Sequence, residues 1–260
     1  MKKMTTTGIL GLGLALSPPS YSDTLFGIYA GGGSINYDLS GDFTDLNQAG
    51  ASSVDLEQNL GLSGDRGNYI YIALEHGIPI LPNIKLAHSD IQESATNTLS
   101  ENISFGGTTF PIGSIIATNI DFSHTDLTLY YEILDNWISL DAGFTIRTFD
   151  GELSAFGRHP LLPGISLNAN EDLDFTAPLL YGKARFDLPV TGLYLGAEVN
   201  WIGIGDAQLY DAWAHVGYVF GFGLGLEAGM RNLGMELDDV EDLDADIDLK
   251  GTYIAATFHF

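Results

Sequence analysis

Apolar and polar residues alternate at every second position over long stretches of this chain. In one stretch Ile138, Leu140 and Phe144 fall on one face of an extended chain, whereas Asp141 and Arg147 fall on the other. A period of two is typical of a β-strand whose two faces meet different surroundings. The pattern predicts ten strands, at residues 24–37, 68–76, 83–92, 120–133, 137–152, 174–187, 192–203, 207–220, 222–237 and 242–260.

Short and long connections alternate between these strands, except at residues 203–206, where a short one replaces a long one. The short connections are 77–82, 134–136, 188–191 and 221, and the long ones are 38–67, 93–119, 153–173 and, more modestly, 238–241. Outer-membrane barrels have short periplasmic turns and longer external loops. We therefore predict an all-β fold: a closed, antiparallel, up-and-down transmembrane β-barrel of about ten strands, rather than eight or twelve.

The last predicted strand runs to the final residue of the chain. Its apolar face includes Ile254, Phe258 and the terminal Phe260. This ending resembles the C-terminal signature by which outer-membrane barrels are recognised for insertion. We expect the barrel-assembly machinery to bind this strand, and outer-membrane lipid and lipopolysaccharide to surround the barrel.

One irregularity interrupts the pattern of the last strand. Leu243, Ile247 and Leu249 have the opposite parity from Ile254 and Phe258. One inserted residue would restore the phase, so we predict a β-bulge at Gly251. The alternative is that the upper part of the strand leaves the bilayer, where its facing no longer follows the lipid.

The N-terminal residues 1–22 have the three parts of a secretory signal peptide. Lys2 and Lys3 precede a short apolar stretch, and small residues follow up to Ser22, the expected cleavage position. The apolar stretch is shorter than the ~20 residues that a spanning helix needs. Residues 23–260 are then a single barrel domain in the outer membrane of a Gram-negative bacterium, expected to be a monomer.

The amino-acid composition limits the classes of molecule that this protein could bind. The chain has 34 acidic and 10 basic residues, a net charge of −24, and no cysteine. Nucleic acid is excluded as a partner because phosphate binding needs clustered Lys and Arg, and a pore selective for anions is disfavoured for the same reason. We expect no cofactor and no disulfide.

Thirteen ionisable residues fall on the polar face of the predicted strands and would point into the bore. A narrow bore can be filled by side chains, and charges there must be paired or hydrated. Two interpretations stay open: an ion-paired plug that holds the barrel shut, or a narrow polar path for small solutes. The predicted luminal charge network comprises Glu75, Lys85, Asp126, Glu132, Asp141, Arg147, Lys183, Arg185, Glu198, Asp211, His215, Glu227 and Arg231.

Two other clusters of residues are weak candidates for a metal site or a catalytic site. Residues 238–248 are rich in Asp but lack the turn glycine and the bidentate Glu of an EF-hand, so we predict no metal site. Ser123 and His124 point to opposite faces of a strand and cannot form a dyad. His124 and Asp126 share a face, which would be the place to look for a barrel enzyme acting on lipid or peptide.

The segment from Glu75 to Leu86, which contains Pro79 and Pro82, looks like a motif of a family of small proteobacterial outer-membrane proteins with OmpW-like character. The residues from Tyr37 to Phe43 are also similar to it. The resemblance implies a barrel of this length, and OmpW-type barrels are associated with passage of small apolar molecules. We expect a non-enzymatic role in envelope structure or limited passage of small molecules. The alternatives are a barrel enzyme and an exported soluble β-sandwich or adhesin.

Overall fold

A computed structural model describes residues 26–47, 51–161, 164–240 and 242–260. The predicted signal peptide, residues 1–22, lies outside the described residues. Within these ranges the chain forms β-strands joined by turns, and no helix there is long and apolar enough to cross a membrane. The strands are β1 (Phe26–Asp45), β2 (Val54–Asp55), β3 (Arg66–His76), β4 (Asn83–Asp90), β5 (Gln92–Thr98), β6 (Ile103–Phe105), β7 (Thr108–Phe110), β8 (Ile115–Asp121), β9 (His124–Asp135), β10 (Ile138–Phe149), β11 (Glu152–Arg158), β12 (Ser166–Asp172), β13 (Phe175–Asp187), β14 (Leu193–Ile204), β15 (Ala207–Val219), β16 (Leu224–Val240) and β17 (Leu243–His259).

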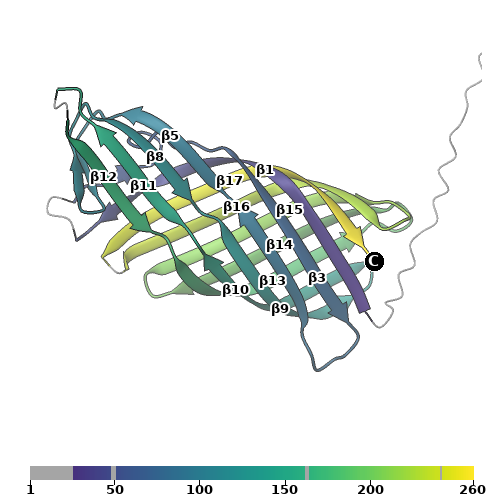
Figure 1. Cartoon of the computed structure of the whole chain (residues 1–260). Helices are drawn as coiled ribbons and strands as arrows, with labels where there is room; N and C mark the ends of the chain where they lie inside the picture. The colour runs from purple at the N-terminus through teal and green to yellow at the C-terminus, as the bar shows by residue number, and fades with distance from the viewer. Residues whose placement is uncertain (1–25, 48–50, 162–163, 241) are drawn as a thin grey trace, which may run out of the picture.

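Ten of these strands close into one antiparallel barrel, as predicted. Their order is β17-β16-β15-β14-β13-β10-β9-β4-β3-β1, and β17 pairs with β1 to complete the ring. The closing ladder is long, since it runs from Tyr29↔His259 to Asp45↔Leu243. Figure 1 shows the barrel from the side, with the C-terminus at the end where the turns are short.

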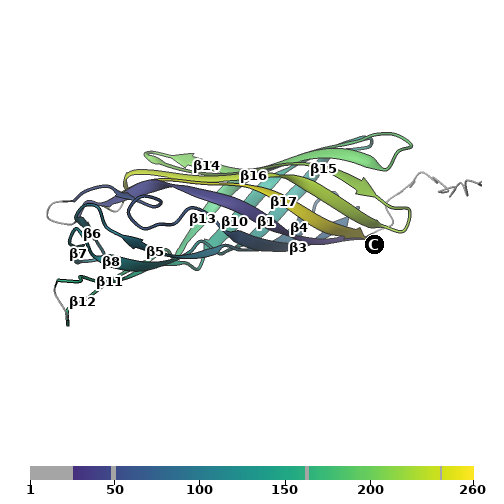
Figure 2. The same ribbon diagram turned by 90° about the horizontal axis from the view of Figure 1, so that it is seen from above.

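Four barrel strands continue beyond the barrel as a second sheet. β5, β8, β11 and β12 extend β4, β9, β10 and β13 after breaks of one or two residues, and they keep the same order, β12-β11-β8-β5. Figures 1 and 2 show this sheet at the end of the barrel away from the C-terminus. Residues 93–119 and 153–173 were predicted to be loops, and that expectation is wrong for most of their length.

The second sheet covers an apolar core that is continuous with the upper part of the barrel, since the same cluster includes Leu209, Leu233 and Leu249. Ile116, Ile120, Leu153 and Ala155 point inward from β8 and β11 and are buried. They belong to one cluster with Leu56 and with other residues of the segment between β2 and β3. The opposite face of the sheet carries exposed polar residues. The sheet therefore has one buried apolar face and one solvent-exposed face, as in a water-soluble protein. We call this second sheet, with β2, β6, β7 and their connections, the head.

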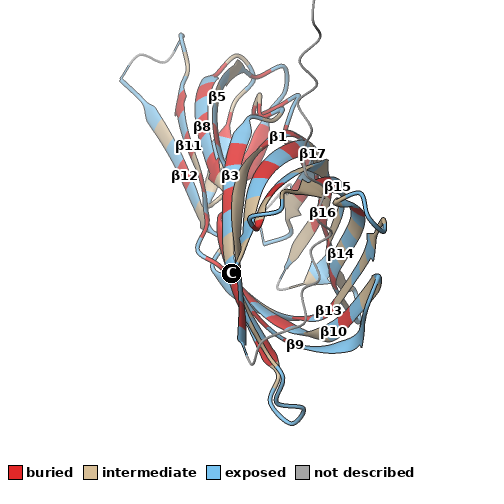
Figure 3. Cartoon of the chain, turned by 90° about the vertical axis from the view of Figure 1, so that its right-hand side faces the viewer, coloured by how far each residue is buried: buried red, intermediate tan, exposed pale blue. Residues whose placement is uncertain are grey.

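The polarity of both barrel faces changes along the strands. On β17, the outward residues are Ile254 and Phe258 near the short turns, but Lys250 and Asp246 near the head. The inward residue Leu249 is buried among apolar side chains at that second level. Figure 3 shows the resulting alternation of buried and exposed residues along the strands.

The predicted bulge at Gly251 is wrong. Gly251 pairs with Tyr37 on one side and with Arg231 on the other, and neither ladder shifts register there. The alternation of the strand never changes phase. What changes along the strand is the surroundings of its two faces. This agrees with the alternative interpretation, in which the upper part of the strand no longer faces lipid.

A continuous apolar band surrounds the barrel between its short turns and the level of this change. Its side chains point away from the bore and remain exposed, whereas in a soluble protein a surface this apolar would be covered. The band includes Ile72, Leu86, Leu129, Phe144, Leu180, Leu195, Val199, Val216, Leu226, Met230 and Ile254.

Inward-facing glycines leave room for large luminal side chains. A Cβ atom on Gly31 would collide with the ring of Tyr71, and one on Gly217 would collide with the ring of Tyr194. Each ring therefore lies flat against the wall of a neighbouring strand. The three glycines at residues 31–33 all allow such close packing.

The band predicts a sharp difference between two outward positions. Leu129→Arg places a charge in the middle of the band and should cost about 2–4 kcal/mol of folding free energy in a bilayer. Thr96→Arg, at an exposed position of β5 in the head, should change it by less than about 0.5 kcal/mol. Equilibrium unfolding in lipid vesicles measures both values, and equal costs would contradict this assignment of the two surfaces.

Candidate luminal site

All thirteen residues of the predicted charge network line one cavity inside the barrel. The cavity has a volume of about 550 Å³. Residues of the short turns, such as Asn136, Pro189 and Gly223, also line it, so it reaches the end of the barrel that carries those turns. It extends up the bore as far as Arg147 and Arg231.

The upper boundary of the cavity is a buried layer built around Asp211. Both oxygens of this carboxylate accept hydrogen bonds from Arg231, at 2.8 and 2.9 Å, and one also accepts from Arg147 at 2.7 Å. Arg147 donates two further bonds of 2.7 Å to Asp126. The side chains of Asp211, Arg147 and Arg231 are each at most 2% exposed. Two guanidinium groups and two carboxylates thus neutralise one another in a site that is almost entirely buried.

This layer crosses the bore. Arg231 lies on β16 and donates to Ser89 on β4 at 3.0 Å and to Nε2 of His124 on β9 at 2.9 Å. β16 and β9 are five strands apart in either direction round the ring of ten. The Nδ1 of His124 lies 2.9 Å from the carbonyl of Phe122 and donates to it when Nε2 accepts from Arg231. We call Asp126, Arg147, Asp211, Arg231, His124 and Ser89 the sealing layer.

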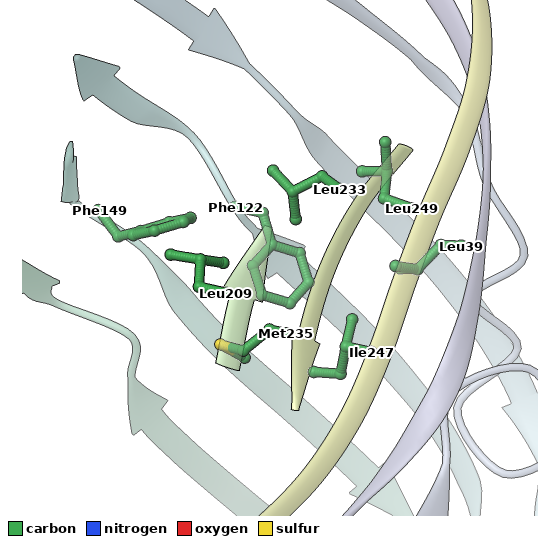
Figure 4. A pocket seen from close by; sticks show the side chains of 8 residues that line it. All are labelled: Leu39, Phe122, Phe149, Leu209, Leu233, Met235, Ile247 and Leu249. Atoms are coloured by element: carbon green, nitrogen blue, oxygen red, sulfur yellow. The ribbon is translucent and has the colours of Figure 1, made fainter. Parts of the chain in front are cut away.

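An apolar cluster lies directly above the sealing layer. On three strands the next inward residue toward the head is apolar: Phe149 follows Arg147, Leu209 lies beyond Asp211, and Leu233 follows Arg231. Figure 4 shows that these side chains converge with Leu39, Phe122, Met235, Ile247 and Leu249. The void between them is about 10 Å³, enough for one water molecule at most. Ions and apolar side chains therefore close the bore in succession.

Below the sealing layer, ion pairs line a wider bore. Lys85 on β4 binds Glu198 on β14 at 2.6 Å, a second contact between distant walls. Lys183 lies 3.3 Å from Asp141 on the neighbouring strand. Arg185 binds Asp187 at 2.8 Å, and its guanidinium lies 3.7 Å from the centre of the Tyr194 ring.

The remaining carboxylates of the network have other surroundings. Glu75 accepts a hydrogen bond of 2.7 Å from Tyr130, and Glu227 accepts one of 2.6 Å from Tyr194. Nε2 of His215 lies 3.9 Å from Glu227. Glu132 lines the cavity close to the short turns.

The predicted luminal network was limited to acidic, basic and histidine residues, so it left out the tyrosines and the neutral polar residues of the bore. Tyr71, Tyr130, Tyr181 and Tyr194 all line the cavity. Thr145 donates a bond of 2.6 Å to Asn200, within the buried part of the bore. The signal was available, because these residues have the same strand parity as the charges. They were passed over because tyrosine is as common on a lipid-facing strand end as inside a barrel.

The two other candidate clusters form no site in the described chain. His124 and Asp126 are both held by arginines, and both ring nitrogens of His124 have partners. The acidic residues of β17 lie on its outer face, with Asp246 opposite Asp42 and Glu236. Among the described residues, no three His, Asp or Glu side chains are grouped so that they could hold a metal ion.

Comparison with known proteins supports the fold. No model of a protein family matches the sequence, and no curated protein matches it significantly. The outer-membrane protease OmpT of Escherichia coli aligns with 90% of this chain and 96% of its own, with a TM-score of 0.50 and 12% identity. The chain folds as an outer-membrane β-barrel.

Two further barrels align with lower scores. A FadL homologue of Pseudomonas aeruginosa covers 90% of both chains with a TM-score of 0.35 and 12% identity. The toluene transporter TodX of P. putida does so with a TM-score of 0.33 and 10% identity. The resemblance to OmpW-like proteins gains no support from these structures and stays a prediction.

We expect that removing the central charge of the sealing layer strongly reduces the folding free energy. Asp211→Asn leaves Arg231 and Arg147 buried with one carboxylate between them, which should cost about 3–5 kcal/mol of folding free energy. The matched control is Lys250→Gln, which breaks the exposed pair with Asp248 and should cost less than about 1 kcal/mol. Unfolding in urea in the presence of lipid measures both, and similar small losses would show that the layer is not a unit.

Proposed function

We propose that this protein is an integral barrel of the bacterial outer membrane whose bore is sealed. Its role is to anchor the head at the cell surface, and it is not an open pore. The observation that carries the proposal is the sealing layer with the apolar cluster directly above it. The envelope-structural role predicted from sequence is thus favoured over passage of small molecules.

The apolar band supports the membrane position. Phe26, Tyr131 and Trp137 are exposed near the short turns, and Trp201 is exposed near the level at which the outer face becomes polar. Aromatic side chains gather at the two boundaries of a bilayer. With the band in lipid, the short turns and the C-terminal strand lie in the periplasm and the head lies outside the cell.

The pairing within the sealing layer supports a permanent seal. Separating the walls would leave buried guanidinium and carboxylate groups without partners, which costs several kcal/mol per ion. The apolar cluster has no polar group that could guide water or a solute through it. A solute would have to break both layers in turn.

The head supports a surface role. Its outer face carries Thr96, Asn119 and Asn170, which are exposed and uncharged, on three different strands. The segment between β2 and β3 is fixed to β5 because the buried Glu93 accepts backbone hydrogen bonds from Ser63 and Gly64. A sheet fixed in this way presents a constant surface outside the cell.

Several finer points belong to the same proposal. The signal peptide is cleaved near Ser22, and the barrel-assembly machinery recognises the last strand, on whose outer face Ile254 and Phe258 are exposed. Lipid and lipopolysaccharide surround the band, and the barrel acts as a monomer without cofactor. The protein is not an enzyme in this proposal, because both ring nitrogens of His124, the histidine that shares a strand face with Asp126, already have partners in Phe122 and Arg231.

Electrical recording tests the seal. The purified barrel, inserted into a planar bilayer in about 1 M salt, where the Debye length is about 3 Å, should give no steady conductance, since no continuous water path crosses it. A general porin in the same bilayer serves as the positive control. Regular open events with a constant unit conductance would overturn the sealed-barrel proposal and favour passage of solutes.

A further inference from the structure

The cavity below the sealing layer has an excess of negative charge. Nine carboxylate side chains line it, against five side chains of Lys or Arg. Walls of low dielectric constant strengthen the field of such a charge distribution and raise the local concentration of cations. Because the cavity closes at the sealing layer, a molecule that enters from the short-turn end meets a blind pocket.

Two of these carboxylates make no direct contact with the charged group of a lysine or arginine. Within the described part of the chain, Glu75 and Glu227 form no ion pair with a lysine or arginine. Each is held in place by one tyrosine hydroxyl instead, Tyr130 for Glu75 and Tyr194 for Glu227. They are fixed anionic acceptors that face the cavity.

One ammonium group of the protein itself, that of Lys85, is bound inside this cavity by a carboxylate and aromatic rings. The Nζ atom of Lys85 makes bonds of 2.6 and 2.7 Å to the two oxygens of Glu198. The same atom lies 5.3 Å from the ring centre of Tyr71 and 5.7 Å from that of Tyr181. A carboxylate together with aromatic faces is the environment that binds organic cations.

We propose that the cavity binds a small organic ammonium ion. Glu75 and Glu227 supply the charge, and the tyrosine rings supply the walls. A volume of about 550 Å³ lies within the usual range of small-molecule sites. Two separate acceptors favour a molecule with two ammonium groups over one with a single group. The membrane orientation in the proposed function determines only the side of entry, which is the periplasm.

Calorimetric titration of the detergent-solubilised barrel with putrescine, a linear diammonium ion, tests the site. Putrescine should bind, and succinate, a dianion of similar length, should not. Glu75→Gln with Glu227→Gln should weaken putrescine binding at least tenfold, while each amide still accepts the tyrosine hydroxyl. The control, Asp244→Asn with Asp246→Asn, removes the same charge from the outer face and should leave the affinity unchanged.

Three results would overturn the inference. They are no heat of binding with putrescine, an equal loss of affinity in the luminal and outer-face variants, and binding of Mg²⁺ with the same dependence on Glu75 and Glu227. Heat-modifiable gel mobility shows that each variant is folded. The titration is independent of the seal, because detergent exposes both ends of the barrel, so a conducting barrel would refute the proposed function without deciding this site.

Discussion

The carboxylate of Asp211, shared by two buried arginines, is the interaction on which the rest of this structure depends. Charged groups are stable in a site without water only when each has a partner. Here the partners come from β10, β15 and β16, and the layer extends to β4 and β9 through Ser89 and His124. The layer therefore joins walls that the backbone ladders connect only by way of several other strands.

The sealing layer also lies close to the level at which both faces of the barrel change polarity. Toward the short turns, apolar side chains point outward and charged ones line the cavity. Toward the head, the arrangement is reversed: Leu233 and Leu249 are buried inside, while Asp246 is outside. One set of strands thus combines a membrane barrel with the core of a water-soluble sheet, without any change of register in β17 between Ala245 and Phe258.

The sequence allowed the ten barrel strands, the closure and the thirteen luminal residues to be predicted, because strand parity is visible in a single chain. The strands of the head were missed because their outer faces carry Ser, Thr and Asn, which also occur in loops. The bulge at Gly251 followed from the assumption that apolar residues of a barrel strand always face lipid. Above the bilayer that assumption fails, since Leu249 faces a protein core.

The pairs across the bore could not be predicted. Contacts such as Lys85–Glu198 and Arg231–His124 join strands that do not neighbour one another. Which luminal residues meet depends on the stagger of all ten strands, and parity gives only the face on which each residue lies. The same limit hid the pairing of Tyr130 with Glu75 and of Tyr194 with Glu227.

The most direct test of the account uses single cysteines, because the chain has none. Ser139→Cys lies in the cavity and Leu249→Cys lies in the apolar cluster above the seal. In oriented vesicles, a membrane-impermeant maleimide should label the cysteine at 139 from the short-turn side only, and the one at 249 from neither side. Labelling of residue 139 from the head side, or of residue 249 from the short-turn side, would contradict a sealed bore.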